Sequence, residues 1–280
     1  MKWKIVADSS CDPLYGDLET DDIKIAYVPF SITTDNHEYI DNGDIDILSM
    51  VDDFEKSKIS KTACPAIGLW HEELLESENV IAITISSNLS GSYQSAVSAK
   101  NMIIDEFPNK KVVVVNSCSA GSELSLGVVK TIELINEGLD IYQIEEKLND
   151  FFLKSHVIFA LCSFNNFIKN GRVSKAAGFI ATALKIWGIG VGSDDGVIDV
   201  VDKVRSEKKI ISTILNNFET NGFNNGRFAI SHCYNEDLAN KIKDAVLEKW
   251  PNSTYMIGLM TGLCSYYAER SGVIVSYTND

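Results

Sequence analysis

Basic residues are scarce in this sequence of 280 residues. The 25 Lys and Arg stand against 39 Asp and Glu, so the formal net charge is −14 at pH 7. Nucleic-acid phosphates and anionic membrane surfaces are both bound by clustered basic side chains. The composition therefore argues against nucleic acid and anionic membranes as partners. Hydrophobic residues make up 45% of the chain, which excludes wholesale disorder.

Long apolar runs and paired cysteines are also missing. The longest apolar stretch, residues 176–192, contains Lys185 and several glycines. It therefore predicts a buried helix over Ala176–Trp187 that runs into a loop, rather than a membrane span. The N-terminus lacks the apolar core of a signal peptide, and the six cysteines form no CxxC pair. We therefore expect a cytoplasmic protein with reduced thiols and no stable membrane insertion.

Familiar catalytic and cofactor motifs are absent as well. The sequence has no Walker A loop, no GxSxG elbow and no HExxH motif. The glycine-rich segment 188–192 lacks the GxGxxG pattern and follows the predicted helix instead of opening one. Asp8, Asp12, Asp41 and Asp44 could form a hard-metal site, but we expect Asp8 to orient loop hydroxyls and amides and the other three to be solvated. No cofactor, metal or catalytic residue is expected.

Strands and helices alternate along the chain, which predicts an α/β fold. We expect a mainly parallel sheet in a first domain, residues 1–155, and a second α/β domain, residues 156–280. No low-complexity linker divides them, so the ligand site should lie at the domain junction. The predicted strands cover residues 2–7, 23–32, 80–85, 111–115, 157–162, 197–201, 227–231, 254–259 and 273–277.

Hydroxyl-bearing residues follow three of the predicted parallel strands, at residues 8–12, 86–92 and 116–119. Because ligands bind at the carboxyl ends of such strands, these loops should converge. Thr62 lies just ahead of a helix that we expect to begin at Pro65. Helix N-termini and hydroxyls together form an anion site, although Ser and Asn also cap helices without any ligand. We favour an anion site for these four segments.

Several of these segments occur in the same order in a known protein family. They are KIVADSSCD at residues 4–12, VPF at 28–30, YIDNGDI at 39–45, TACP at 62–65, LSGSYQSA at 89–96, NGRV at 170–173 and ISH at 230–232. As an ordered series, with SGSYQSA the most distinctive, they resemble the DegV family over essentially the whole length.

The resemblance implies a carrier, not an enzyme, that binds one long-chain fatty acid in an apolar tunnel. From the apolar composition of the second domain, we expect that domain to form much of the tunnel. It also implies a partner, a bacterial fatty acid kinase that phosphorylates the carboxyl group. The family's carboxylate contacts correspond to Thr62 and Ser90, and the amides of Gly91 and Ser92 should face the same oxyanion. Arg172 corresponds to a family position near the partner surface or the pocket mouth.

Four further residues are expected to support this site: Asp8, Ser9, Ser10 and Thr261. The C-terminal motif of many family members contains a His that joins the carboxylate network. Residues 258–267 stand in its place here and contain no His. Either Thr261 or Tyr266 rebuilds the network, or the ligand differs.

Two other functions remain open from the sequence. A serine-dependent hydrolase would use Ser90 or Ser92 with His232. A regulatory protein would leave the tunnel empty. A serine-reactive probe and extraction of bound lipid distinguish these functions from a fatty acid carrier.

Two further expectations concern the tunnel wall and the partner. The helix Ala176–Trp187 should form one wall, because its small residues leave room for an acyl chain, and Ala181→Phe should fill that room. Arg172 should be exposed in a turn and contribute to partner binding more than to the fold.

Overall fold

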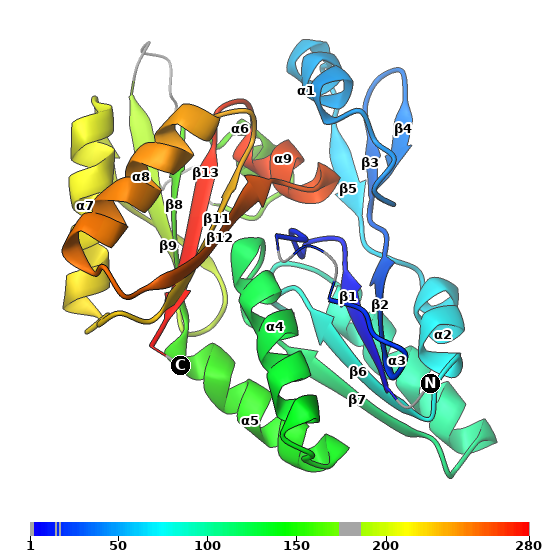
Figure 1. The fold of residues 1–280 in the computed structure, drawn as a ribbon. Coiled ribbons are helices and arrows are strands. Elements are labelled where there is room, and N and C mark those ends of the chain that lie inside the picture. The colour runs from blue at the N-terminus through cyan, green and yellow to red at the C-terminus, as the bar shows by residue number, and fades with distance from the viewer. Residues whose placement is uncertain (1–2, 15, 17, 174–185, 280) are drawn as a thin grey trace.

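The structure, a computed structural model, describes residues 3–14, 16, 18–173 and 186–279. Two large sheets with their covering helices make up most of it, and a small third sheet stands beside them (Figure 1). Every strand of the four-stranded sheet precedes residue 155, and every strand of the six-stranded sheet follows it. Among the described residues, no helix is both long and apolar enough to cross a membrane.

Four strands form the first sheet: β1 (Trp3–Asp8), β2 (Ile23–Val28), β6 (Asn79–Thr84) and β7 (Lys111–Asn116). The order is β2-β1-β6-β7, and all three pairings are parallel. The central strands are apolar and buried on both faces, which is typical of a parallel sheet covered by helices. The predicted α/β fold with a parallel first sheet is confirmed.

Four helices cover this sheet: α2 (Ile67–Leu75), α3 (Ser92–Glu106), α4 (Ser122–Asn136) and α5 (Ile141–Lys154). Val80 and Val112 pack towards α2 and α3, whereas Ile81 and Val113 pack towards α4 and α5. Alternate residues of each strand thus supply two separate cores, one on each face.

The second sheet contains six strands: β8 (His156–Leu161), β9 (Trp187–Gly192), β10 (Ile198–Val204), β11 (Arg227–His232), β12 (Thr254–Leu259) and β13 (Val273–Thr278). The order is β10-β9-β8-β13-β11-β12, in which β11–β12 is parallel and the other pairings are antiparallel. Two helices, α7 (Glu207–Thr220) and α8 (Glu236–Lys249), pack on one face. On the other face, α4 lies between the two sheets (Figure 1), where Ser122 and Ser276 share a hydrogen bond of 2.7 Å.

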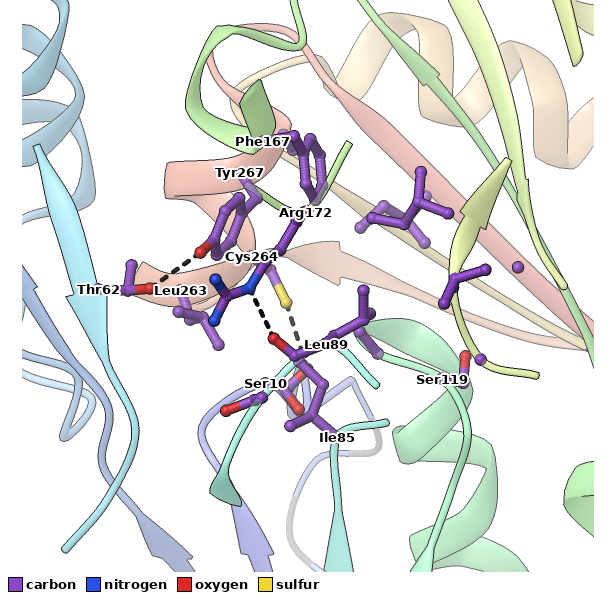
Figure 2. A pocket seen from close by; sticks show the side chains of 18 of the residues that line it. Ser10, Thr62, Ile85, Leu89, Ser119, Phe167, Arg172, Leu263, Cys264 and Tyr267 are labelled. Atoms are coloured by element: carbon purple, nitrogen blue, oxygen red, sulfur yellow. Dashed lines mark hydrogen bonds between the residues drawn. The ribbon is translucent and has the colours of Figure 1, made fainter. Parts of the chain in front are cut away.

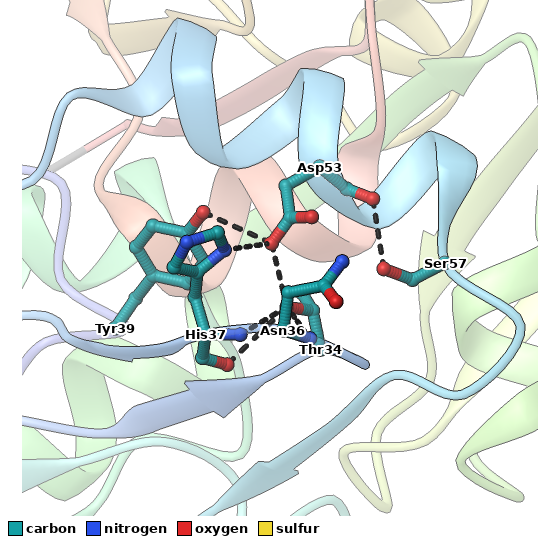
Figure 3. Close-up of polar contacts among 6 residues, drawn as sticks. All are labelled: Thr34, Asn36, His37, Tyr39, Asp53 and Ser57. Atoms are coloured by element: carbon teal, nitrogen blue, oxygen red, sulfur yellow. Dashed lines mark hydrogen bonds and ion pairs between the residues drawn. The ribbon is translucent and has the colours of Figure 1, made fainter.

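A three-stranded antiparallel sheet is formed by β3 (Ser31–Thr33), β4 (Glu38–Ile40) and β5 (Lys61–Ala63), next to α1 (Ile47–Lys56). Asp53 of α1 fastens the β3–β4 hairpin (Figure 3). Its Oδ2 accepts hydrogen bonds from Thr34 Oγ1 at 2.6 Å and from His37 Nδ1 and Tyr39 OH at 3.0 Å. The Thr34 contact contributes most to lowering the pKa of Asp53. These bonds hold β3 in place, and β3 in turn positions β5.

Two short helices, α6 (Asn165–Lys169) and α9 (Gly262–Ala268), contact each other, and α9 also contacts β3 of this small sheet. The rings of Phe54 in α1 and Tyr266 in α9 meet edge-on, with 5.3 Å between their centroids. Asp41 caps the start of α9, because its carboxylate accepts the amides of Gly262 and Leu263, both at 2.8 Å.

Several local predictions are wrong. The strand predicted over residues 23–32 is divided into β2 and β3 at Pro29, because proline has no N–H for a strand ladder and fixes φ. The segment 188–192, predicted as a loop, belongs to β9. The helix predicted over Ala176–Trp187, with Ala181, lies outside the described residues up to residue 185, and Trp187 begins β9.

One buried carboxyl lies in the first turn of α4. Glu123 is 3% exposed, and its oxygens accept hydrogen bonds from the hydroxyls of Ser119 and Ser155. Burial nevertheless raises the pKa of Glu123 from 4.5 to about 7. The folded state therefore binds this proton more tightly than the unfolded chain does. Glu123 consequently lowers the stability as the pH rises between these two values.

Replacing Glu123 with Gln should raise the free energy of unfolding at about pH 8, by up to about 3 kcal/mol, because no buried charge forms. The gain should fade as the pH falls towards about 4, where the wild-type carboxyl is protonated in both states. Thermal melts across this range check the prediction. Glu137→Gln is the matched control, since Glu137 is exposed at the end of the same helix. A gain that does not depend on pH would contradict this account of Glu123.

Candidate functional site

A cavity of about 370 Å³ lies between the loops that follow β1, β6 and β7 and the second sheet (Figure 2). This volume lies in the range of small-molecule sites. Most of the wall is apolar and includes Phe30, Ile85, Leu89, Phe159, Phe167 and Ile274. Both halves of the chain supply this wall.

The four hydroxyl-bearing segments converge on this cavity as predicted. Ser10, Thr62, Ser90 and Ser119 all contribute to its wall. Three of these residues lie in loops after parallel strands, whose carboxyl ends share one edge of the sheet. Thr62 reaches the cavity by another route, from β5 of the small sheet.

A pair of hydroxyls stands at one end of the cavity (Figure 2). Thr62 Oγ1 and Tyr267 OH lie 2.9 Å apart and share a hydrogen bond. Because one hydroxyl donates to the other, the pair keeps one proton for a further acceptor. Burial raises the pKa of Tyr267, so the phenol stays protonated at neutral pH.

The helix predicted to begin at Pro65 begins two residues later, since α2 starts at Ile67. Thr62 itself pairs with Ile32 of β3, so a strand carries Thr62 to the cavity.

Ser90 and Gly91 lie where the loop after β6 enters α3. Ser90 Oγ accepts a hydrogen bond from the Ser92 amide at 3.2 Å, which leaves the Ser90 hydroxyl proton for another acceptor. The Ser92 amide, predicted to face an oxyanion, thus already donates its hydrogen bond to Ser90. Gly91 is the N-cap of α3, and a Cβ on it would lie 3.3 Å from Cys64 Sγ. The partial positive charge of the α3 N-terminus therefore lies at the cavity wall.

Asp8 organises the loops beneath the cavity. Its Oδ1 accepts the Ser10 amide at 3.2 Å and the Ser10 hydroxyl at 2.5 Å, and its Oδ2 accepts the Ile85 amide at 3.0 Å and the Ser92 hydroxyl at 2.6 Å. Burial raises the pKa of Asp8, against the opposing effect of these hydrogen bonds. The prediction that Asp8 orients loop hydroxyls and amides is confirmed. Ser92, which the structure describes, is buried beside Asp8 and does not line the cavity.

Ser9, Asp12 and Thr261 join the two halves of the chain. Asp12 Oδ1 accepts the Thr261 amide at 2.8 Å, and the Thr261 hydroxyl donates to the Ser9 carbonyl at 2.8 Å. Ser9 Oγ accepts the Phe30 amide at 3.0 Å. Burial raises the pKa of Asp12 to about 6. Ser9 and Thr261 therefore support the loops next to the cavity.

The predicted solvation of the acidic residues is correct for Asp44, which is exposed, but wrong for Asp12 and Asp41, which are 0% and 4% exposed. Asp12 and Asp41 bind backbone amides near the C-terminal end of the chain, which the local sequence does not reveal. Within the described ranges, no group of three or more His, Cys, Asp or Glu is placed to hold a metal ion.

Arg172 is one of the residues that line the cavity (Figure 2). Its Nε donates to the Leu89 carbonyl at 2.7 Å and its Nη1 to the Asn170 carbonyl at 2.6 Å. Gly171 has a φ of +69°, a conformation that glycine adopts without strain, and it forms the predicted turn. The Arg172 side chain is exposed and also lines the cavity.

Tyr267 is a cavity residue that was not predicted. Tyr266, one of the two candidates to replace the missing His, points away, because its OH donates to Ser60 Oγ at 2.9 Å. Neighbouring helical residues face directions about 100° apart, so one tyrosine of this pair reaches the cavity and the other does not. The adjacent tyrosines signalled an aromatic hydroxyl here, but choosing between them required the orientation of α9.

Ser90, Ser92 and His232, all within the described residues, do not form a catalytic pair. A nucleophile and its base require a hydrogen bond of about 2.6–3.2 Å. The Ser92 hydroxyl donates to Asp8 instead, and His232 Nδ1 accepts the Asn235 amide at 3.3 Å. Burial lowers the pKa of His232. The geometry offers no activated serine.

Comparison with known proteins gives a consistent result. A family model described as an uncharacterised protein of the DegV family matches residues 2–278. A DegV domain-containing protein of Streptococcus pyogenes is 32% identical over 278 residues, which are 99% of each chain.

Two solved structures are similar over nearly the whole chain. The Streptococcus pneumoniae fatty acid kinase (Fak) B3 protein, loaded with linoleic acid, is 31% identical with a TM-score of 0.95 and full coverage of both chains. A DegV family protein of Eubacterium eligens, loaded with heptadecanoic acid, is 34% identical with a TM-score of 0.94, covering 99% of this chain and 100% of that one. These matches confirm the resemblance seen in the sequence motifs, and the chain belongs to the DegV family.

Proposed function

We propose that the protein binds one long-chain fatty acid, with the acyl chain in the cavity and the carboxylate at the end formed by Thr62, Tyr267 and Ser90. The observation that carries this proposal is the cavity itself, which is apolar along most of its wall and has the Thr62–Tyr267 hydroxyl pair at one end. The two similar structures, loaded with linoleic acid and heptadecanoic acid, support it.

The two ends of such an acid require different partners. Each buried methylene contributes about 0.8 kcal/mol, so the acyl chain supplies most of the affinity. The carboxylate needs donors, and the Ser90 hydroxyl and the spare proton of the Thr62–Tyr267 pair provide them. The N-terminus of α3 at Gly91 adds partial positive charge, and Arg172 adds a full charge at the mouth.

We infer further that the protein is a carrier which presents the bound acid to a fatty acid kinase. A carboxylate held near the exposed Arg172 lies close to the surface, where a second protein can reach it. The name of the similar Streptococcus pneumoniae protein, a B3 protein of a fatty acid kinase, supports this role. The Ser92 hydroxyl donates to Asp8 and His232 Nδ1 accepts the Asn235 amide, so no observation favours the hydrolase alternative.

Wild-type protein should bind palmitate, and Ser90→Ala, Thr62→Val and Tyr267→Phe should each weaken that binding about ten- to hundredfold. Each change removes either a hydrogen bond to the charged carboxylate, worth roughly 1.5–3 kcal/mol, or the hydroxyl that orients the spare proton of the Thr62–Tyr267 pair towards it. Titration calorimetry measures the affinity, and thermal melts on the same samples measure the stability. The absence of palmitate binding in the folded wild type would refute the proposed function.

The matched control is Ser92→Ala, because Ser92 neighbours Ser90 but donates to the buried Asp8. This variant should lose about 1–3 kcal/mol of stability and keep its affinity for palmitate. If the three hydroxyl variants also keep full affinity and lose stability alone, the carboxylate is held elsewhere in the cavity.

Arg172→Ala should leave the melting temperature nearly unchanged, because the side chain is exposed. Palmitate affinity should fall no more than about fivefold, since an exposed charge contributes up to about 1 kcal/mol. Phosphorylation of the bound acid by a fatty acid kinase should fall more than the affinity does. Arg205→Ala, which removes an exposed charge outside the cavity wall, is the control. Unchanged phosphorylation would remove Arg172 from the partner surface, and complete loss of palmitate binding would make it a principal carboxylate ligand.

A further inference from the structure

A second cavity, of about 440 Å³, adjoins the first. It lies between the C-terminal end of α5, the start of β8 and the turn between β9 and β10. Its wall includes Asn149, Leu153, His156 and Asp194. Three residues belong to the walls of both cavities: Cys118, Val157 and Gly192. The two cavities therefore meet at these three residues.

The glycine-rich strand β9 contributes to the partition between the cavities at Gly192, which lines both of them. Its glycines occupy alternate positions and so share one face of the strand. A Cβ added to them would lie far too close to side chains already there: 2.4 Å from Phe164 Cε2 at Gly188, 2.2 Å from Phe159 Cε2 at Gly190, and 2.8 Å from Val157 Cγ1 at Gly192. Neighbouring side chains thus lie directly on the bare backbone of β9.

The side chain that covers the glycine backbone differs along β9. A phenylalanine ring covers Gly188 and Gly190, whereas the smaller Val157 covers Gly192, where the two cavities meet. A valine fills less of the space left by the missing side chain than a phenyl ring does. Where the two cavities meet, the Val157 side chain therefore covers the bare backbone of Gly192.

A bound acid would point its methyl end towards this partition. The spare proton of the Thr62–Tyr267 pair lies at the end of the cavity across from Ser119 (Figure 2). Ser119 donates its own proton to the buried Glu123, a residue of the second cavity's wall. A carboxylate at the Ser119 end would meet this acidic group instead of a donor, so the apolar end of the ligand belongs there.

We propose that Val157 sets the length of acyl chain that the protein accepts, and that the second cavity receives the end of longer chains when the Val157 side chain moves aside. This inference rests on the proposed binding of a fatty acid. With the carboxylate fixed at one end, the distance to Val157 determines how many methylenes fit. Replacing this one side chain should therefore shift chain-length selectivity without moving the carboxylate.

Competitive loading tests this proposal. Purified protein is stripped of lipid and incubated with an equimolar mixture of lauric, palmitic, stearic and behenic acids, and the bound acids are extracted and measured by mass spectrometry. Val157→Phe should lower the ratio of stearic to lauric acid about tenfold, because displacing two methylenes from the cavity costs about that factor in affinity. Val157→Ala should raise the ratio of behenic to palmitic acid about tenfold, because it joins the cavities. Val201→Phe is the control, since Val201 is 55% exposed on β10 and lines neither cavity.

The outcomes separate this inference from the function on which it rests. If the wild type binds none of the acids, the proposed function fails. If the wild type binds them and both Val157 variants keep its chain-length profile, the proposed function stands and the role of Val157 is refuted. If Val157→Phe does not fold, the Val157→Ala result decides, because this change creates space and an unchanged behenic to palmitic ratio would refute the inference.

Discussion

The buried carboxylate of Asp8 positions the loops from which the cavity is built. It receives four hydrogen bonds, from its own loop and from the loop that follows β6. The Ser86 amide donates to the Ser119 carbonyl at 2.8 Å and joins the third loop to these two. A buried carboxylate is stable only when donors surround it, and burial alone raises the pKa of Asp8. The need to satisfy this one group therefore fixes where Ser10 and Ser90 stand.

Two further buried carboxylates also need hydrogen-bond donors, and they find them in the second half of the chain. Asp12 binds the Thr261 amide, and Asp41 caps α9 at Gly262 and Leu263. Helix α9 carries Tyr267, so these contacts determine where the phenol meets Thr62. The polar end of the cavity thus depends on three acidic side chains that do not themselves line it.

The sequence predicts those parts of the site that depend on the order of strands and loops along the chain. Ser10, Ser90 and Ser119 follow consecutive strands of one parallel sheet, so their convergence follows from topology. Thr62 could not be placed in this way, because its strand has three residues and is defined by pairing with β3. The burial of Asp12 and Asp41 depends on partners more than 200 residues away. Strand β9 was not predicted, because glycine disfavours strands. In the structure, aromatic side chains from neighbouring elements cover the glycine backbone of this strand.

The most direct test of the central claim, that the cavity holds a fatty acid, is organic extraction of the freshly purified protein followed by mass spectrometry. The account predicts close to one long-chain fatty acid per protein chain, and no labelling of Ser90 or Ser92 by a fluorophosphonate probe. Absence of any extracted acid would contradict the account. Labelling of either serine would then favour a hydrolase, and no labelling would leave a regulatory protein with an empty cavity.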